Sequence, residues 1–166
     1  NIYVAGGTTS DDLRGTSGNA GPIIFSTSRG GATDGFVSII SNNGSSLIKT
    51  VYVGTSGVDM VYGIQFDKFG FPYITGTTTV TFPVINSPFN QVEQSAGKQF
   101  ITKMEPDLSR VIYNANFGKG QSVPDISPTA FLVDRCENVY VAGWGGGINA
   151  GEGYANANTT GLKTTP

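Results

Sequence analysis

The side chains of this chain that could do chemistry are carboxylates, hydroxyls and a few aromatic rings, because it has no histidine and a single cysteine, Cys136. The lack of histidine excludes Ser-His-Asp triads, His-based zinc sites and the commonest general base. One cysteine excludes thiolate clusters and an intrachain disulfide. An enzyme made from these residues would therefore depend on paired Asp and Glu side chains, as glycoside hydrolases do.

The carboxylates stand where the sequence predicts turns. Asp67 and Asp134 occupy equivalent positions of a repeated segment, which places them on different structural units. An Asp at a turn most often accepts hydrogen bonds from its own backbone. We therefore expect no catalytic residues and predict that the chain is not an enzyme.

Two other carboxylates are candidates for binding. Asp59 and Asp125 lie in Gly- and Ser-containing loops, five and six residues before matching apolar positions. Loop carboxylates and backbone carbonyls together can hold calcium. No Asp-x-Asp-x-Asp run, which would indicate a specific calcium site, is present. Calcium binding at Asp59 and Asp125 therefore remains an alternative, and we expect no other metal or cofactor.

The one tryptophan is the third candidate. Trp144 precedes Gly145–Gly147, a run with neither the Gly-Lys-Ser/Thr sequence nor the following helix of a phosphate loop. The plain interpretation is a turn that carries a half-buried ring. The functional interpretation is a platform on which a sugar or a partner protein stacks.

A repeated unit must position these residues. Its clearest segment occurs three times, at offsets of 70 and 67 residues: Asn1–Gly6, Phe71–Gly76 and Asn138–Gly143. Further segments recur in the same order: 34–40 with 98–104, 47–54 with 111–118, and 62–67 with 129–134. A near-fixed period is the signature of a repeat architecture. Because Tyr3, Tyr73 and Tyr140 recur at equivalent positions, we expect them in the core.

The repeated segments are typical of strands. Each is short, rich in β-branched and aromatic residues, and bounded by Gly, Asn, Asp or Ser. The expected strands include Ile2–Ala5, Phe36–Ile40, Ile48–Val53, Ile64–Phe66, Phe100–Met104 and Val111–Tyr113. Tight turns are expected at Asn42–Ser45, Asp67–Gly70, Pro106–Ser109 and Asp134–Asn138. No window keeps an apolar period of 3.6 residues beyond about two turns, so no helix is expected.

Four antiparallel strands that recur as a unit predict an all-β fold of β-propeller blades. Residues 1–147 hold about two and a half units, with boundaries near 64–70 and 131–138. Residues 148–166 are a Gly/Asn/Thr-rich loop or the start of a further unit. A pair of duplicated β-sandwiches is the rival fold, although a sandwich usually needs about seven strands.

About two and a half units are too few to close a ring, so we expect the chain to be part of a larger propeller. Further blades or protein partners should then cover its open edges. The start of the chain within a repeat motif, without an initiator Met, also suggests a piece of a longer protein. The long loops at 7–33 and 77–97, with the loop at Trp144, are the expected contact surface.

Composition limits the partners and the location. Only 13% of the residues are charged and 24 are glycine, which favours an extracellular all-β protein. Ten basic residues stand against twelve acidic ones without a basic cluster, so we expect no nucleic-acid binding. No apolar run reaches the length of a membrane span.

The motifs resemble those of a known family. Strands that end in Asp, Tyr-Val-Ala-Gly-type strands and Asp-Gly-Phe-Val strands resemble the SBBP-type β-propeller repeats of large secreted Bacteroidetes proteins. The matching residues are Asn1–Ser10, Asp34–Val37, Tyr52–Gly54, Tyr62–Asp67, Tyr73–Thr78, Phe82-Pro83 and Val133–Gly143. Phe71-Pro72 and Lys98-Gln99 depart from the family pattern. The run Asp125–Asp134 with Asn138–Gly146 is similar to closing repeats of gliding-motility-associated surface proteins exported by the type IX system.

The resemblance implies no catalytic residues and a place outside the cell or on its surface. We therefore expect a non-enzymatic structural or adhesion-type propeller segment of an exported bacterial protein. Its partners would be other proteins, further blades of the same parent chain, or surface glycans. One alternative is a carbohydrate-binding or carboxylate-based glycoside-acting module. Another is an accessory subunit of an outer-membrane secretion or motility complex.

Overall fold

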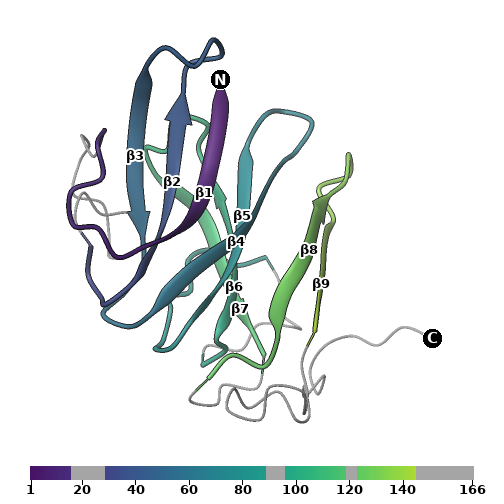
Figure 1. Cartoon of the computed structure of the whole chain (residues 1–166). Coiled ribbons are helices and arrows are strands. Elements are labelled where there is room, and N and C mark those ends of the chain that lie inside the picture. Colours follow the sequence, from purple (N-terminus) through teal and green to yellow (C-terminus); the bar gives the residue numbers. More distant parts are fainter. Residues whose placement is uncertain (16–28, 89–95, 119–122, 145–166) are drawn as a thin grey trace.

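The computed structural model describes residues 1–15, 29–88, 96–118 and 123–144 (Figure 1). In these ranges all regular structure is β-strand, as the sequence predicted. The described residues contain no helix that is long and apolar enough to cross a membrane. The strands are β1 (Ile2–Thr8), β2 (Asp34–Ile40), β3 (Leu47–Val53), β4 (Asp59–Phe66), β5 (Pro72–Thr78), β6 (Gln99–Met104), β7 (Val111–Phe117), β8 (Ser127–Val133) and β9 (Val139–Trp144). The predicted tail at 148–166 and most of the two long loops lie outside the described residues.

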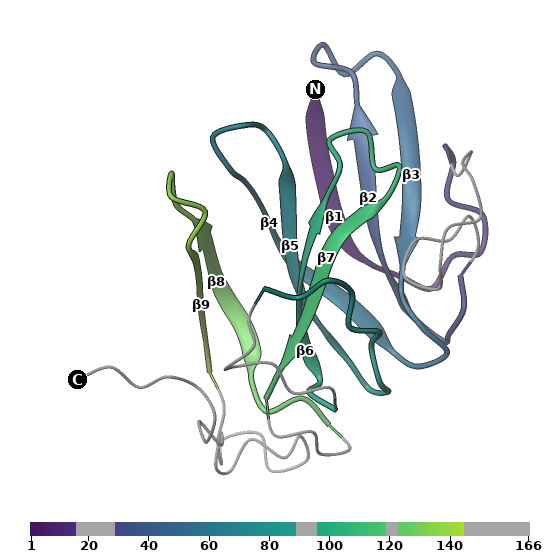
Figure 2. The same cartoon turned by 180° about the vertical axis from the view of Figure 1, so that it is seen from behind.

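The strands form three antiparallel sheets in which neighbours in sequence are neighbours in space. The first sheet has the order β1-β2-β3, the middle sheet β4-β5-β6-β7, and the last sheet β8-β9. Figures 1 and 2 show the first and last sheets on either side of the middle one. Strand β4, an edge strand of the middle sheet, contacts both β1 and β8 and so joins all three sheets.

Tight turns close the hairpins where the sequence predicted them. In the turn from β4 to β5, the Gly70 amide donates to the Asp67 carbonyl at 3.1 Å, and Gly70 has a φ of 87°. The equivalent turn of the last sheet places Glu137 at that position with a φ of 65°. Glycine adopts this left-handed conformation without steric cost, whereas Glu137 is strained there. The Glu137 side chain has a partner in the middle sheet, described below.

The hydrophobic core lies between the first and middle sheets. Val37 and Val53 from the first sheet pack in one cluster with Ile74 from the middle sheet. Phe82 stacks on Phe100 with ring centroids 4.2 Å apart and planes at 4°. All seven residues of β5 are buried, because sheets lie against both of its faces. The middle sheet is therefore the most enclosed part of the chain.

The sheets are offset by one strand from the sequence repeat. The repeated Tyr-containing segment forms β1, β5 and β9, but in the middle sheet β4 precedes it. The first sheet carries the equivalents of β5, β6 and β7, and the last sheet carries the equivalents of β4 and β5. The chain passes between sheets at 53–59 and 117–127, upstream of the unit boundaries predicted near 64–70 and 131–138.

The three equivalent tyrosines do not share one environment. Tyr73 is buried at 1% exposure, as predicted, and Tyr3 is half-buried. Tyr140 is 54% exposed, so its predicted place in the core is wrong. The reason is the neighbouring sheet: Tyr73 reaches Glu137 of the last sheet, while no further sheet among the described residues covers Tyr140.

Candidate functional site: an uncharged groove between β4 and β8

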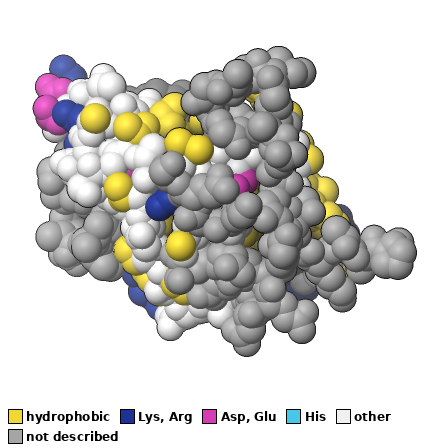
Figure 3. All heavy atoms as spheres, turned by 90° about the horizontal axis from the view of Figure 1, so that it is seen from below, with side chains coloured by type: hydrophobic (Ala, Val, Ile, Leu, Met, Phe, Trp, Pro, Cys, Tyr) yellow, Lys and Arg dark blue, Asp and Glu magenta, His cyan; other side chains and the backbone are white. Residues whose placement is uncertain are grey.

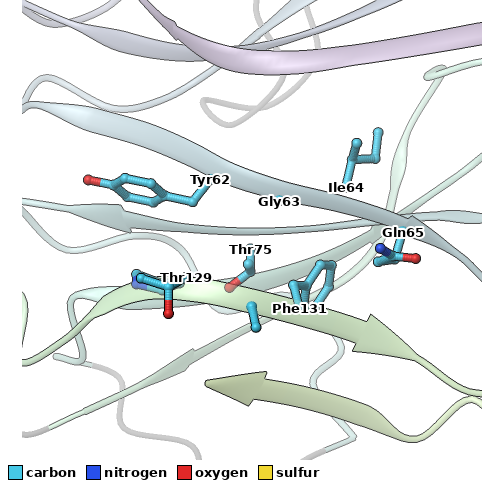
Figure 4. Close-up of a pocket in the computed structure, with 9 residues that line it drawn as sticks. Tyr62, Gly63, Ile64, Gln65, Thr75, Thr129 and Phe131 are labelled. Carbon is cyan, nitrogen blue, oxygen red and sulfur yellow. The ribbon is translucent and has the colours of Figure 1, made fainter. Parts of the chain in front are cut away.

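A groove runs between β4, an edge strand of the middle sheet, and β8, the first strand of the last sheet (Figure 4). Its cavity of about 340 Å³ lies in the size range of small-molecule sites. The lining comes from β4, β5 and β8: Tyr62, Gly63, Ile64, Gln65, Thr75, Pro128, Thr129, Ala130 and Phe131. The groove therefore joins residues about 65 positions apart that the fold brings together.

Two β-bulges at equivalent positions shape this groove. The β4–β5 register passes from Val61↔Gly76 to Gly63↔Thr75, which leaves Tyr62 as an extra residue. The β8–β9 register skips Thr129 in the same way. A bulge bends its strand and re-aims the side chain of the extra residue. Figure 4 shows Tyr62 and Thr129 at the same end of the groove, on facing strands.

The close approach of β8 to β4 depends on Gly63. A Cβ atom at this position would lie 3.1 Å from Cβ of Phe131, tighter than ordinary van der Waals contact. Glycine therefore permits the Phe131 ring to form one wall of the groove. Figure 4 shows Phe131 and Gln65 toward the end opposite Tyr62, with Thr75 between.

The lining combines apolar surface with uncharged polar groups. Tyr62 is 49% exposed, and Thr129 is exposed as well. The Thr129 hydroxyl donates to the Ala142 carbonyl at 3.4 Å, which directs its lone pairs away from that carbonyl. The side chains of Tyr62 and Gln65 make no hydrogen bond to other described residues. The groove thus offers hydrogen-bonding capacity, and none of its lining residues is Asp, Glu, His, Cys, Lys or Arg.

Trp144 ends β9 opposite Ser127 and is 42% exposed. It does not line the groove. The glycine run after it lies outside the described residues.

Asp59 is the first residue of β4 and is completely buried. Its Oδ2 accepts from the Thr55 amide at 2.7 Å and from the Thr55 hydroxyl at 2.8 Å. Its Oδ1 has no hydrogen-bond partner of normal geometry in the described part of the chain. Burial raises the pKa of Asp59; contacts with Thr78 and Thr55 lower it, and nearby Asp34 raises it further. Complete burial keeps this carboxylate from direct contact with a large ligand.

Asp125 is also buried, at 7% exposure. Its amide donates to Gln99 Oε1 at 3.2 Å, and Gln99 Nε2 donates to Asp125 Oδ2 at 3.3 Å. This reciprocal pair fastens the segment before β8 to the start of β6. Among the described residues, no group of three or more His, Cys, Asp or Glu side chains could hold a metal ion, so neither Asp59 nor Asp125 belongs to such a ligand set.

The turn carboxylates behave as the sequence predicted. Asp67 Oδ1 accepts from the amides of Phe69 and Phe71, and Asp134 Oδ1 accepts from the amides of Cys136 and Asn138. The two residues lie in separate sheets, which supports a structural role for both. Asp134 also accepts from the Tyr140 hydroxyl at 3.1 Å.

A charged cluster that sequence reasoning missed joins the middle and last sheets. Lys103 Nζ lies 2.9 Å from both Asp67 Oδ2 and Glu137 Oε2. The ammonium also lies 4.9 Å from the centroid of the Tyr73 ring. Burial would lower the pKa of Lys103, but hydrogen bonds with Tyr73, Glu137 and Asp67 outweigh burial and raise it. A signal existed: Lys103 stands where the equivalent residue of the first unit is apolar Ile39.

Sequence reasoning also missed the groove, because neither Tyr62 nor Thr129 was singled out. Their equivalence in the repeat was visible, but their bulges and the approach of β8 to β4 were not. No family model matches the chain, and no curated protein matches it.

Proposed function

We propose that this chain is a non-enzymatic structural and interaction module, built from β-propeller-type blades, of an exported bacterial cell-surface protein. The observation that carries the proposal is the contrast between equivalent strands. Strand β5 is buried along its whole length between two sheets, whereas β1 and β9 expose apolar side chains. The first and last sheets therefore expose strand faces whose equivalents in the middle sheet are buried.

The first sheet gives the clearest comparison. Ile2 and Val4 are 46% and 40% exposed, while their equivalents in β5, Pro72 and Ile74, are buried. Apolar patches on a soluble surface mark interaction sites. Seen from below, hydrophobic side chains reach the surface at several separate places, with a few charged side chains near them (Figure 3). Further blades or protein partners are the occupants we propose for the outer faces.

The blade assignment is supported by the middle sheet. It has four antiparallel strands joined in sequence order, with a sheet on either side of it, as blades in a propeller have. The non-enzymatic assignment is supported by the carboxylates. Asp67 is paired with Lys103, and Asp125 is bonded to Gln99, so both serve the packing of the sheets.

Association tests the interaction role. We expect sedimentation equilibrium to detect reversible self-association of the chain through its outer faces at high concentration. The double substitution Ile2→Lys and Val4→Lys should weaken this association, because it places two charges on the apolar face of β1. Phe69→Lys is the matched control, since Phe69 is 64% exposed in a turn. A monodisperse monomer at every concentration, with one cooperative unfolding transition, would contradict the proposal.

The cell-surface location rests on the resemblance of the repeat motifs to those of exported proteins. An antibody against the folded chain tests it on intact cells of the producing bacterium. We expect labelling without lysis. Labelling that requires lysis would refute the location and leave the interaction role standing.

A further inference from the structure

We propose that the groove between β4 and β8 binds a neutral sugar residue of a glycan, with the Tyr62 ring as its stacking surface. This inference goes beyond the scaffold role, because it assigns a ligand class to one defined site. It also differs from the sequence expectation, which placed a stacking platform at Trp144.

The charge of the lining selects a neutral ligand. None of the nine lining residues is Asp, Glu, Lys or Arg. An anionic ligand would find no cation in the groove to offset its desolvation, and a cationic ligand would find no carboxylate. A neutral ligand loses less on leaving water and needs only hydrogen bonds in return.

The polar groups of the lining match hydroxyl groups. Gln65 offers both an amide donor and a carbonyl acceptor, and the Thr129 hydroxyl can still accept after donating to Ala142. Sugar hydroxyls are both donors and acceptors, so one ring can use both kinds of group. The Gln65 side chain has no partner among the described residues, and a ligand would therefore not displace an existing bond.

The apolar part of the lining matches the other surface of a sugar. Tyr62 keeps half of its surface exposed, and an aromatic ring presents an apolar face with a polar tip. Pro128 and Phe131 extend the apolar surface along the groove, whereas the Ile64 side chain packs against the hydrophobic core on the other face of β4. The C–H groups of a pyranose ring can lie on such a surface while its hydroxyls reach the polar side chains.

The site is held by rigid elements. Tyr62 and Thr129 project from bulges that are fixed on both sides by paired strand residues. Thr75, behind them, is completely buried, and its hydroxyl donates to the Phe100 carbonyl at 3.0 Å. A preorganised groove loses less conformational entropy when it binds a ligand.

The test is a titration of the full chain, followed by ¹H–¹⁵N NMR, with methyl glycosides of glucose, galactose, mannose and N-acetylglucosamine in both anomeric forms. We expect saturable shifts for at least one glycoside at Tyr62, Gln65 and Thr129, with a dissociation constant of about 1 mM. Methyl glucuronide, which carries a carboxylate, should bind at least about tenfold more weakly than the corresponding glucoside.

Two variants locate the site. Tyr62→Ala should weaken binding at least about tenfold, and Thr129→Val, which keeps the side-chain shape, about threefold. Tyr140→Ala is the matched control, because Tyr140 is an exposed tyrosine outside the groove, and it should leave binding unchanged. A dispersed spectrum of each variant verifies folding.

Three results would overturn the proposal: no saturable shift with any glycoside, binding that survives both groove substitutions, or shifts centred on Trp144. None of these would bear on self-association through the outer faces. The scaffold role and the sugar site can therefore fail separately.

Discussion

Individual carboxylates hold the segments of this chain together, each by a different balance of interactions. Asp67 has a full set of partners: two backbone amides and the Lys103 ammonium. Asp59 has partners for one oxygen only. The negative charge of Asp67 therefore stabilises the folded state, whereas the buried negative charge of Asp59 destabilises it. Substitutions at the two sites should therefore act in opposite directions.

Asp59→Asn should preserve or raise the free energy of unfolding at pH 7, by up to about 1 kcal/mol, because the amide oxygen can still accept from Thr55 without a buried charge. Asp59→Ala should lower it by about 1–3 kcal/mol, since the Thr55 amide loses its acceptor. Urea unfolding measures both. Equal losses in the two variants would contradict this account of Asp59.

The same residue predicts a pH dependence. Burial raises the pKa of Asp59 in the folded state above its unfolded value. Its contribution to stability is thus fully present below the unfolded pKa and is lost as pH rises through the folded pKa. Urea midpoints measured between pH 4 and pH 8, a range that begins at the ordinary Asp pKa of about 3.9 and extends above it, should show this decline in the parent and not in Asp59→Asn.

Lys103→Met should lower the free energy of unfolding by about 3 kcal/mol, because it leaves the Asp67 carboxylate buried without its cation. The side chain of Asp67 is 0% exposed and that of Lys103 is 12% exposed. Adding Asp67→Asn should recover most of the loss. Lys68→Met is the control, since exposed Lys68 should change stability by less than about 0.5 kcal/mol. A double variant no more stable than the single one would contradict the pairing.

At the scale of elements, equivalent strands differ in what lies beside them. Gly6 and Gly76 are equivalent residues of β1 and β5. A Cβ atom on Gly76 would overlap the Met60 carbonyl oxygen of β4 and the Phe100 ring. A Cβ atom on Gly6 would meet only the Phe36 ring, at 3.2 Å. The difference arises because β1 is an edge strand and β5 is not.

Gly76→Ala should therefore lower the free energy of unfolding by about 3 kcal/mol or more, since backbone of β4 must move. Gly6→Ala should cost less than about 1 kcal/mol, because a side chain can yield more readily than a backbone. Urea unfolding of the two variants, compared with the parent, measures the difference. Similar losses would show that β1 has a neighbour on its outer edge.

Strands and turns could be predicted from sequence because their signals are local. The turn at Asp67 needs only a carboxylate and a residue with a left-handed backbone, and both lie within four residues. The groove could not be predicted, because it depends on two bulges and on the approach of β8 to β4. The one-strand offset between the sheets and the sequence repeat could not be predicted for another reason. A repeated sequence does not indicate which of its strands comes first in a sheet.

At the scale of the whole molecule, one enclosed sheet lies between two partly exposed ones. The middle sheet contains the strand that is buried along its whole length, and the outer sheets carry the exposed surfaces that partners can contact. Equivalent residues of the repeat are buried where a neighbouring sheet is present and exposed where none is described. Tyr73, at 1% exposure, and Tyr140, at 54% exposure, are the clearest pair. The proposed interaction role depends on this contrast.

Amide hydrogen exchange of the whole chain, followed residue by residue by NMR, tests this contrast most directly. We expect the amides of β5 and β6 to exchange only through global unfolding, because both strands are interior to a four-stranded sheet. Amides of β1 that point away from β2 should exchange through local opening and much faster. Uniform protection of β1 at the level of β5, or rapid exchange throughout the middle sheet, would contradict the account.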